Sequence, residues 1–229
     1  MDFNDTKDEA AFRAEARAFL DKHLTPKTGA RPRPGSGKDA LQRAKDWQKI
    51  KAENKFAQIT WPKEWGGRGG TSMQSVIWGQ EESKYDAPTG PFAIGLGMCV
   101  PTVIAFGSDA HKERYVQKAL MGEEIWCQLF SEPSAGSDVA GLKTRAVKDG
   151  DEWVINGQKV WTSGAHYSDY GIVLVRTDPK VPKHKGLTMF IVNMKQKGVD
   201  VRPIHQASGG REFNEVYFTD VRIPDSDRL

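Results

Sequence analysis

In the first half of the chain, apolar residues recur at spacings of three and four, which is the pattern of amphipathic helices. Thr6 and Glu9 have the spacing of a capping box, so a first helix is predicted to begin after Thr6. Its apolar face includes Phe12 and Leu20, and Pro26 prevents the helix from continuing. Further helices are predicted over residues 39–54, 73–85, 92–106 and 110–121.

After Gly122 the pattern changes to the alternation of apolar and polar residues that is typical of strands. Asp149-Gly150 and Asn156-Gly157 are hairpin signals, because these residue types tolerate positive φ. Strands are predicted over residues 143–147, 152–155, 158–162, 171–176, 187–193, 199–203 and 215–222. Short strands without intervening helices indicate an antiparallel β-barrel or sandwich.

The two patterns together predict an α+β protein, with an N-terminal all-α domain over residues 1–122 and a β domain over residues 123–229. The hydrophobic fraction of 38% and the charged fraction of 28% are those of an ordinary folded protein with a real core. The net charge is only +3, from 33 basic and 30 acidic residues, which does not indicate a nucleic-acid partner.

Several features bear on the cellular compartment. The N-terminus is acidic and is not followed by an apolar run, so it does not resemble a secretory signal. Residues 87–108 are uncharged but interrupted by Pro and Gly, which favours a buried helix over a membrane span. Cys99 and Cys127 lack metal-ligand spacing and are predicted to be buried thiols. We therefore expect a cytoplasmic protein without a membrane segment or a metal site.

Two loops are candidates for binding an anion. The first carries Arg31, Arg33 and Lys38 among Gly and Pro residues, and a solvated loop is the favoured interpretation. The second, residues 61–70, holds four glycines within five positions. It lacks the Lys-Ser/Thr ending of a P-loop and follows no predicted strand, so a structural role is predicted.

The segment Ser-Glu-Pro-Ser-Ala-Gly-Ser-Asp, residues 131–138, has the composition of a ligand-binding turn. Its small residues let backbone N–H groups approach a ligand, and successive N–H groups in a turn can bind an anion. Pro133 stiffens the entry to the turn, and Asp138 is expected to hold the loop through bonds to its own backbone. An ordinary turn is the alternative.

About 25 residues further on, Trp161 is followed by Thr162 and Ser163 at the end of a predicted strand. An indole there can cover a planar ring, and a hydroxyl can reach a nitrogen at the edge of that ring. The alternative is a core tryptophan that caps the barrel.

The order of these motifs resembles the acyl-CoA dehydrogenase family. In this sequence, a helical half precedes Ser-Glu-Pro-x-Ala-Gly-Ser-Asp at 131–138 and Asn-Gly-x-Lys-x-Trp at 156–161. Residues 61–67 are similar to the family's helical-domain loop, and residues 213–224 are similar to its last barrel strand. The resemblance covers essentially the whole chain, and the two barrel motifs together are more specific than either alone.

The resemblance implies FAD as cofactor. Ser131 matches the family's hydroxyl position at the pyrimidine edge of the flavin. Trp161 matches the tryptophan that packs on the flavin, and Ser163 matches the hydroxyl position at flavin N5. Glu132 matches a glutamate of the turn and is expected to be structural. The implied cofactor-binding residues are Gln128, Leu129, Phe130, Ser131, Gly136, Ser137, Trp161, Thr162 and Ser163.

Two further segments are candidates for contact with the substrate. Ser137 matches a position near the pantetheine arm of the thioester. Residues 95–101, including Met98, are a candidate wall for the acyl chain, with plain core as the alternative. The basic residues Lys180, Lys183, His184 and Lys185 could meet the CoA phosphates, although a solvated loop is favoured.

The implied reaction is the α,β-dehydrogenation of an acyl-CoA to the trans-2-enoyl-CoA. A carboxylate removes the α-proton while the β-hydride passes to flavin N5. The family's base lies in a C-terminal helical domain, and no residue of this sequence matches it, so no catalytic residue is assigned. We therefore expect a fragment or one half of a two-part enzyme, inactive alone.

The partners that the resemblance implies are an acyl-CoA, an electron-transfer flavoprotein as electron acceptor, and a homo- or hetero-oligomer, with a homotetramer as the family form. Three alternatives remain open at this point: an acyl-CoA oxidase, a flavin monooxygenase of the same fold, and a non-catalytic subunit that binds a partner chain.

Overall fold

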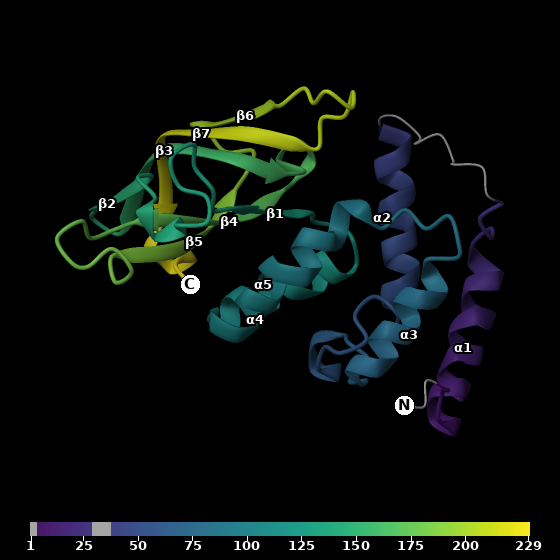
Figure 1. Cartoon of the computed structure of the whole chain (residues 1–229). Coiled ribbons are helices and arrows are strands. Elements are labelled where there is room, and N and C mark those ends of the chain that lie inside the picture. The colour runs from purple at the N-terminus through teal and green to yellow at the C-terminus, as the bar shows by residue number, and fades with distance from the viewer. Residues whose placement is uncertain (1–3, 29–37) are drawn as a thin grey trace. The chain divides into compact units, whose positions relative to one another are not determined.

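The computed structural model describes residues 4–28 and 38–229, which form two compact units (Figure 1). The first unit holds the described residues up to 91 together with 120–123, and the second holds residues 92–119 and 124–229. Two helices that precede residue 122 in the sequence therefore belong to the same unit as the sheet. Arg31 and Arg33 lie outside the described residues, and Lys38 begins a helix.

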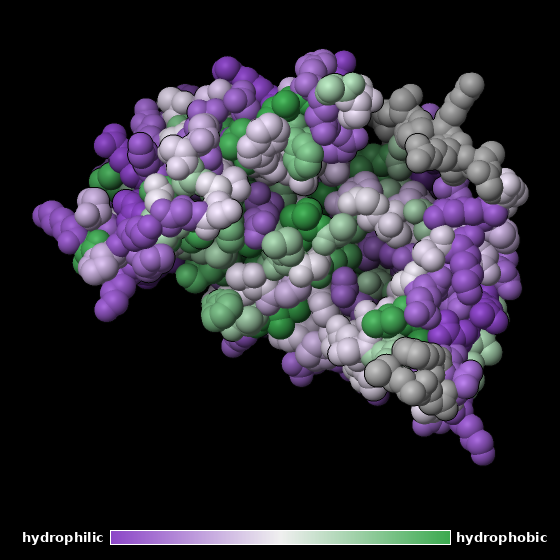
Figure 2. Space-filling model, viewed as in Figure 1, coloured by the Kyte–Doolittle hydropathy of each residue, from purple (hydrophilic) through white to green (hydrophobic). Residues whose placement is uncertain are grey.

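The first unit is helical, as predicted. It contains α1 (Lys7–His23), α2 (Lys38–Glu53) and α3 (Ser72–Glu82), and a short 3-10 turn at Lys63–Trp65 lies within the predicted glycine loop. The capping box is confirmed, because the Glu9 amide donates to Thr6 Oγ1 at 3.3 Å and the Thr6 amide to Glu9 Oε2 at 2.7 Å. In Figure 2 the visible side of α1 is mostly hydrophilic, as its period requires.

Aromatic residues dominate the core of this unit. The Phe56 ring stacks on Phe19 at a centroid distance of 4.5 Å and on Trp78 at 4.6 Å. These rings bury large apolar areas where α1, α3 and the segment after α2 meet. The buried members of the core are Phe12, Ala16, Leu20, Trp47, Phe56, Ile59, Ile77, Trp78 and Tyr85.

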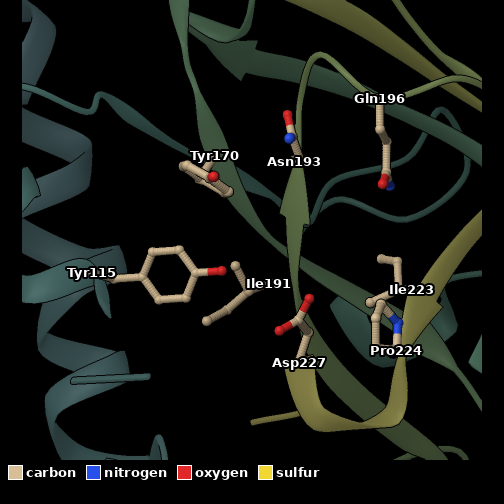
Figure 3. A pocket seen from close by; sticks show the side chains of 8 residues that line it. All are labelled: Tyr115, Tyr170, Ile191, Asn193, Gln196, Ile223, Pro224 and Asp227. Carbon is tan, nitrogen blue, oxygen red and sulfur yellow. The ribbon is translucent and has the colours of Figure 1, made fainter. Parts of the chain in front are cut away.

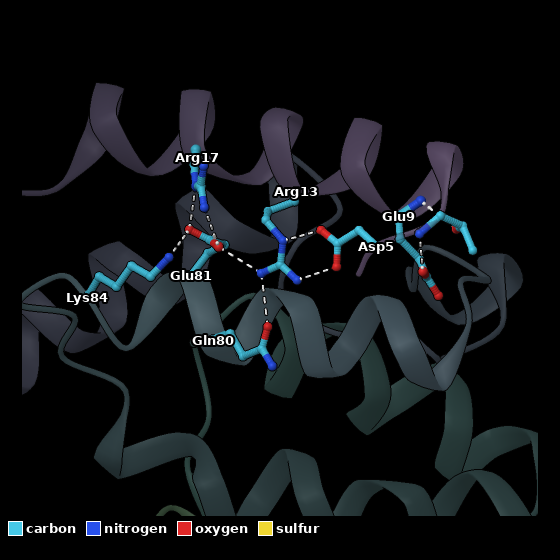
Figure 4. A network of polar contacts seen from close by, with 8 residues as sticks. Asp5, Glu9, Arg13, Arg17, Gln80, Glu81 and Lys84 are labelled. Carbon is cyan, nitrogen blue, oxygen red and sulfur yellow. Dashed lines mark hydrogen bonds and ion pairs between the residues drawn. The ribbon is translucent and has the colours of Figure 1, made fainter. Parts of the chain in front are cut away.

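An ion network joins α1 to α3 (Figure 4). Glu81 is fully buried, and its carboxylate lies 2.8 Å from Arg13, Arg17 and Lys84. Burial alone would raise the pKa of Glu81, but the hydrogen bonds from Arg17, Lys84 and Arg13 outweigh it and lower the pKa to about 2. Arg13 also binds Asp5, which ties the segment before α1 to the same network.

The second unit begins with an irregular helical stretch. A single helix was predicted over residues 92–106, but the structure has a π-helical turn at Gly95–Cys99 followed by α4 (Val100–Phe106). Pro101 has no N–H to donate to the carbonyl of Gly97, so the regular α-helical ladder is interrupted there. The last helix, α5 (Asp109–Leu120), lies where it was predicted.

The second unit is built on a strongly curved seven-stranded sheet (Figure 1). The strands are β1 (Trp126–Leu129), β2 (Arg145–Asp149), β3 (Glu152–Ser163), β4 (Tyr170–Arg176), β5 (Leu187–Asn193), β6 (Val199–Pro203) and β7 (Phe213–Pro224). They lie in the order β1-β4-β2-β3-β7-β6, with β5 on β4. The α+β class is confirmed. The prediction of an antiparallel sheet is wrong in part. The sheet is mixed, because β1 pairs with β4 in parallel and β2 meets β4 in parallel through Arg145 and Arg176.

The two hairpin predictions have different outcomes. β2 and β3 form an antiparallel hairpin around Asp149-Gly150, as predicted. The hairpin at Asn156-Gly157 is wrong, because β3 runs through this dipeptide and shifts its register against β7 there. A Cβ on Gly157 would lie 2.4 Å from Thr144 Oγ1, so the glycine permits close approach of the segment just before β2 and does not form a turn.

Cys99 and Cys127 are buried free thiols, which confirms that prediction. Burial raises the pKa of both thiols. Among the described residues, no helix is both long and apolar enough to cross a membrane.

Candidate cofactor site

The structure brings the two barrel motifs together within the second unit. The Val160 amide donates to the Ser131 carbonyl at 2.9 Å, so the segment after β1 lies along β3. One residue earlier on β3, the Lys159 ammonium donates to the Phe130 carbonyl at 3.0 Å. The predicted cofactor residues 128–131 and 161–163 are therefore neighbours in space, although about 30 residues separate them in the sequence.

Glu132 holds the turn, as predicted. Its carboxylate accepts hydrogen bonds from the amides of Lys143 at 2.6 Å and Thr144 at 2.9 Å, and from the Lys159 ammonium at 2.8 Å. Burial alone would raise the pKa of Glu132, but the bonds from Lys159, Thr144 and Lys143 hold it below the ordinary value. A buried carboxylate with three donors is poorly suited to remove a proton from a substrate.

The Trp161 indole is 59% exposed, so it is a surface ring and not a core cap. Its backbone has φ of 59°, which is uncommon for a residue other than glycine. The Phe213 ring meets the indole edge-on, with centroids 6.0 Å apart and planes at 85°. The chain thus presents one flat aromatic surface beside the loop that carries Ser131.

The two hydroxyl residues after Trp161 lie in different surroundings. Thr162 is 2% exposed, and its hydroxyl is buried without a hydrogen-bond partner among the described residues. Ser163 ends β3 and is partly exposed. Of the two side chains, the Ser163 hydroxyl is thus the one open to a ligand at the surface.

Gly136 and Ser137 are exposed in the turn that follows Glu132. A Cβ at Gly136 would have no atom within 4 Å, so the backbone is open to a ligand. The Asp138 backbone carbonyl accepts from the Gly141 amide, in keeping with the expected backbone bonds, and its carboxylate also binds the Lys183 ammonium at 2.7 Å, which was not predicted. Lys183, which belongs to the predicted basic loop, therefore forms an ion pair with this turn.

Met98 lies in the π-helical turn and is 42% exposed. The turn packs on β1, since Cys99 Sγ donates to the Cys127 carbonyl at 3.4 Å. β1 contains Gln128 and Leu129 and leads directly into Phe130 and Ser131, so the candidate acyl wall lies against the strand that carries the candidate cofactor loop.

Two residues with a role at this site were not predicted from the sequence. Lys159 is 0% exposed and joins the two motifs by binding both Glu132 and Phe130. Asn214 on β7 is also 0% exposed and donates to the Thr162 carbonyl at 2.9 Å. For Lys159 the sequence offered two signals: it is the fixed lysine of the Asn-Gly-x-Lys-x-Trp motif, and a charged residue within a strand pattern requires a buried partner.

A small cavity in this unit is lined by none of the predicted cofactor residues (Figure 3). Its volume is about 40 Å³, and its lining includes Tyr115, Gln196 and Asp227. Gln196 Nε2 is buried there and has no hydrogen-bond partner among the residues that the structure describes, and burial raises the pKa of Asp227. A water molecule takes about 30 Å³ of liquid, so this space suits water and is too small for an acyl chain or a flavin.

The comparisons identify the family. Residues 6–123 match the acyl-CoA dehydrogenase N-terminal domain, and residues 127–221 match the acyl-CoA dehydrogenase middle domain. The chain belongs to the acyl-CoA dehydrogenase family.

Among individual relatives, the acyl-CoA dehydrogenase IpdE1 of Mycobacterium tuberculosis is 40% identical over 94% of this chain and 57% of its own length. The mitochondrial isovaleryl-CoA dehydrogenase of Pongo abelii is 30% identical over 96% of this chain and 52% of its own length. The ChsE4-ChsE5 complex of Mycobacterium tuberculosis matches with a TM-score of 0.82 at 30% identity, covering 100% of this chain and 57% of that chain. The chain thus spans about half the length of these relatives.

Proposed function

We propose that this chain is the flavin-binding portion of an FAD-dependent acyl-CoA dehydrogenase, an oxidoreductase that acts on a CH–CH bond. The observation that carries the proposal is the exposed Trp161 indole, held beside the Ser131 loop by the Val160–Ser131 hydrogen bond. A flat ring, an adjacent open turn at Gly136 and nearby hydroxyls suit a planar isoalloxazine with a phosphate-bearing arm.

In this proposal each segment has a defined role. The backbone from Gln128 to Ser131 would border the pyrimidine edge of the flavin. Trp161 would cover one face of the ring, and the Ser163 hydroxyl would donate at N5. Gly136 and Ser137 receive the pyrophosphate and the pantetheine arm. Bound FAD supplies the acceptor for the β-hydride of the substrate, and donors near its pyrimidine edge stabilise the charge of the reduced form.

The proposal requires a base from outside the described site. Glu132 is occupied by three donors, and the relatives that match this chain are nearly twice as long. We propose that a C-terminal helical domain supplies the catalytic carboxylate, either from a longer polypeptide or from a partner chain. We also propose that the boundary in the sequence between the family's N-terminal and middle domains lies near residue 122.

The partners are proposed on the same basis. The acyl-CoA binds along Met98 and Ser137, and an electron-transfer flavoprotein accepts the electrons in the cytoplasm. The solved ChsE4-ChsE5 complex contains two kinds of subunit by its name, and the Tcur3481-Tcur3483 steroid acyl-CoA dehydrogenase is 31% identical to this chain. These names favour a hetero-oligomer over the homotetramer, and a substrate panel that includes steroid side-chain thioesters.

Turnover measurements test the proposal. The chain alone is expected to show no acyl-CoA-dependent reduction of an artificial acceptor, and addition of a C-terminal domain is expected to create that activity. Turnover by the chain alone would contradict the missing-base argument. Rapid formation of peroxide under air, faster than reduction of the acceptor, would favour an acyl-CoA oxidase instead. FAD binding without turnover in every assembled form would favour a non-catalytic subunit.

A further inference from the structure

The end of β3 at the candidate site is irregular. Between Lys159 and Thr162 the strand advances three residues while its partner β7 advances two, from Val216 to Asn214. One residue is therefore extra on β3, which defines a β-bulge. Trp161 lies in this bulge with φ of 59°, a conformation that costs roughly 1–2 kcal/mol for a non-glycine residue and needs outside support.

Asn214 provides that support from the facing strand. Its Nδ2 donates to the Thr162 carbonyl at 2.9 Å and to the Glu212 carbonyl at 3.2 Å. The Glu212 carbonyl also accepts from the Gly164 amide at 2.8 Å. The Asn214 side chain therefore links the end of β3, at Thr162, to the residue that pairs with Gly164 just after that strand. Because Asn214 is 0% exposed, solvent cannot reach its amide, and water cannot replace these hydrogen bonds if they are lost.

The other polar atom of the Asn214 side chain, Oδ1, faces a histidine. Nδ2 contacts two carbonyl oxygens, and a flipped amide would place Oδ1, an acceptor, against both of them. Oδ1 therefore faces His166 Nδ1, at 3.0 Å. An amide oxygen only accepts, and His166 Nδ1 must therefore carry the hydrogen. His166 is exposed, and when its ring is neutral, Nε2 is the nitrogen without a hydrogen and can accept a hydrogen bond.

We infer that Asn214 is the positioning residue of this site: it holds the bulge that exposes the Trp161 indole, orients the Ser163 hydroxyl next to it, and sets the tautomer of His166. Its relevance to catalysis rests on the proposed function, while the geometry itself is open to test without flavin. Asn214 acts on the ligand through the backbone of residues 161–163.

The first experiment uses the unsubstituted chain. In ¹⁵N-detected spectra of the imidazoles at alkaline pH, His166 should be the Nδ1–H tautomer, assigned by its loss in His166→Gln. The Nε2–H tautomer would overturn the inference. This result does not depend on FAD, so the failure of the proposed flavin site would leave it unchanged.

The second experiment follows the indole directly. The chain is labelled with 5-fluorotryptophan, and the Trp161 signal is assigned by Trp161→Phe. Asn214→Asp keeps the shape of the side chain but replaces the two donor hydrogens with an acceptor, so the ¹⁹F signal of Trp161 should shift and broaden. A signal identical to that of the unsubstituted chain would mean that Asn214 only fills space, and would overturn the inference.

A matched control lies in the same pair of strands. Asn156 bonds Asp220 at the other register shift of β3, through its Nδ2 and its Oδ1, each at 3.0 Å. Asn156→Asp should lower stability without moving the Trp161 signal. In the assembled, FAD-loaded enzyme, Asn214→Asp should weaken FAD binding at least tenfold and shift the visible flavin spectrum, whereas Asn156→Asp should do neither.

Discussion

The Lys159 ammonium, 0% exposed, lies 2.8 Å from the Glu132 carboxylate and is the only described cation that binds it. Burial lowers the pKa of Lys159, and the Glu132 charge offsets part of that effect. The two charges are thus stable in the interior only as a pair, and the pair joins the Ser131 loop to the strand that carries Trp161.

Breaking this pair should be costly. Glu132→Gln leaves a buried ammonium without its counter-ion, and a loss of about 3–5 kcal/mol in the free energy of unfolding is expected. Lys159→Met alone should cost a similar amount, while the double variant should recover much of the loss because no unpaired charge remains. Urea denaturation of the three variants measures this, and strictly additive losses would contradict the pairing.

The Glu81 network predicts a dependence of stability on pH. The pKa of Glu81 is about 2 in the folded chain, against an ordinary value of 4.5. Because the folded pKa is the lower one, the stabilisation is complete above about pH 4.5 and is lost as the pH falls towards 2. The shift corresponds to roughly 3 kcal/mol.

Glu81→Gln should therefore flatten the curve of unfolding free energy between pH 4.5 and pH 2. Glu64, an exposed glutamate in the same unit, supplies the control, and Glu64→Gln should leave the curve as it is. Equal slopes for all three chains would show that Glu81 does not carry the effect.

The sequence predicted the architecture because most of its signals are local. The Thr6–Glu9 capping box and the Asp149-Gly150 turn each depend on neighbouring residues, and both formed as expected. Asn156-Gly157 carries the same local signal, yet the strand continues through it. What decides between the outcomes is the close approach of Thr144, which lies just before β2, to Gly157. This tertiary contact is not part of the local turn signal.

The candidate site shows the same limit. The motif residues around Ser131 and Trp161 were identified from their order, and the structure brings them side by side. Asn214 was not identified, because its role depends on three partners that lie on β3, at Glu212 and at His166. Nor does sequence alternation predict that Trp161 takes a positive φ, since the bulge arises from the pairing of β3 with β7.

The buried hydroxyl of Thr162 predicts an unusual substitution. Because Thr162 Oγ1 has no described partner, Thr162→Val removes an unsatisfied group and keeps the volume. We expect a neutral effect or a gain of about 1 kcal/mol in the free energy of unfolding.

Thr144→Val is the matched control, since Thr144 Oγ1 donates to the Gln158 carbonyl at 3.3 Å and the residue is 1% exposed. That variant should lose stability. A clear loss for Thr162→Val in the chain without flavin would show that its hydroxyl does have a partner.

Gly164 lies just after the site and is expected to resist substitution. Its φ is 68°, and a Cβ there would come within 2.5 Å of the Tyr167 hydroxyl. Gly150 has a similar φ of 62° with nothing within 4 Å, so Gly150→Ala isolates the backbone cost of about 1 kcal/mol. Gly164→Ala should lower the melting temperature at least twice as much, and equal effects would mean that Tyr167 moves without cost.

The central claim is that Trp161 and the Ser131 loop form the flavin site. Titration of the assembled enzyme with FAD, followed by the visible flavin spectrum, tests it most directly. Trp161→Ala should weaken FAD binding about tenfold or more, equivalent to about 1.4 kcal/mol, and shift the spectrum. Trp153→Phe, on the same strand with its indole bound to Asp225, should change neither. Unchanged FAD affinity and an unchanged spectrum in Trp161→Ala would contradict the account.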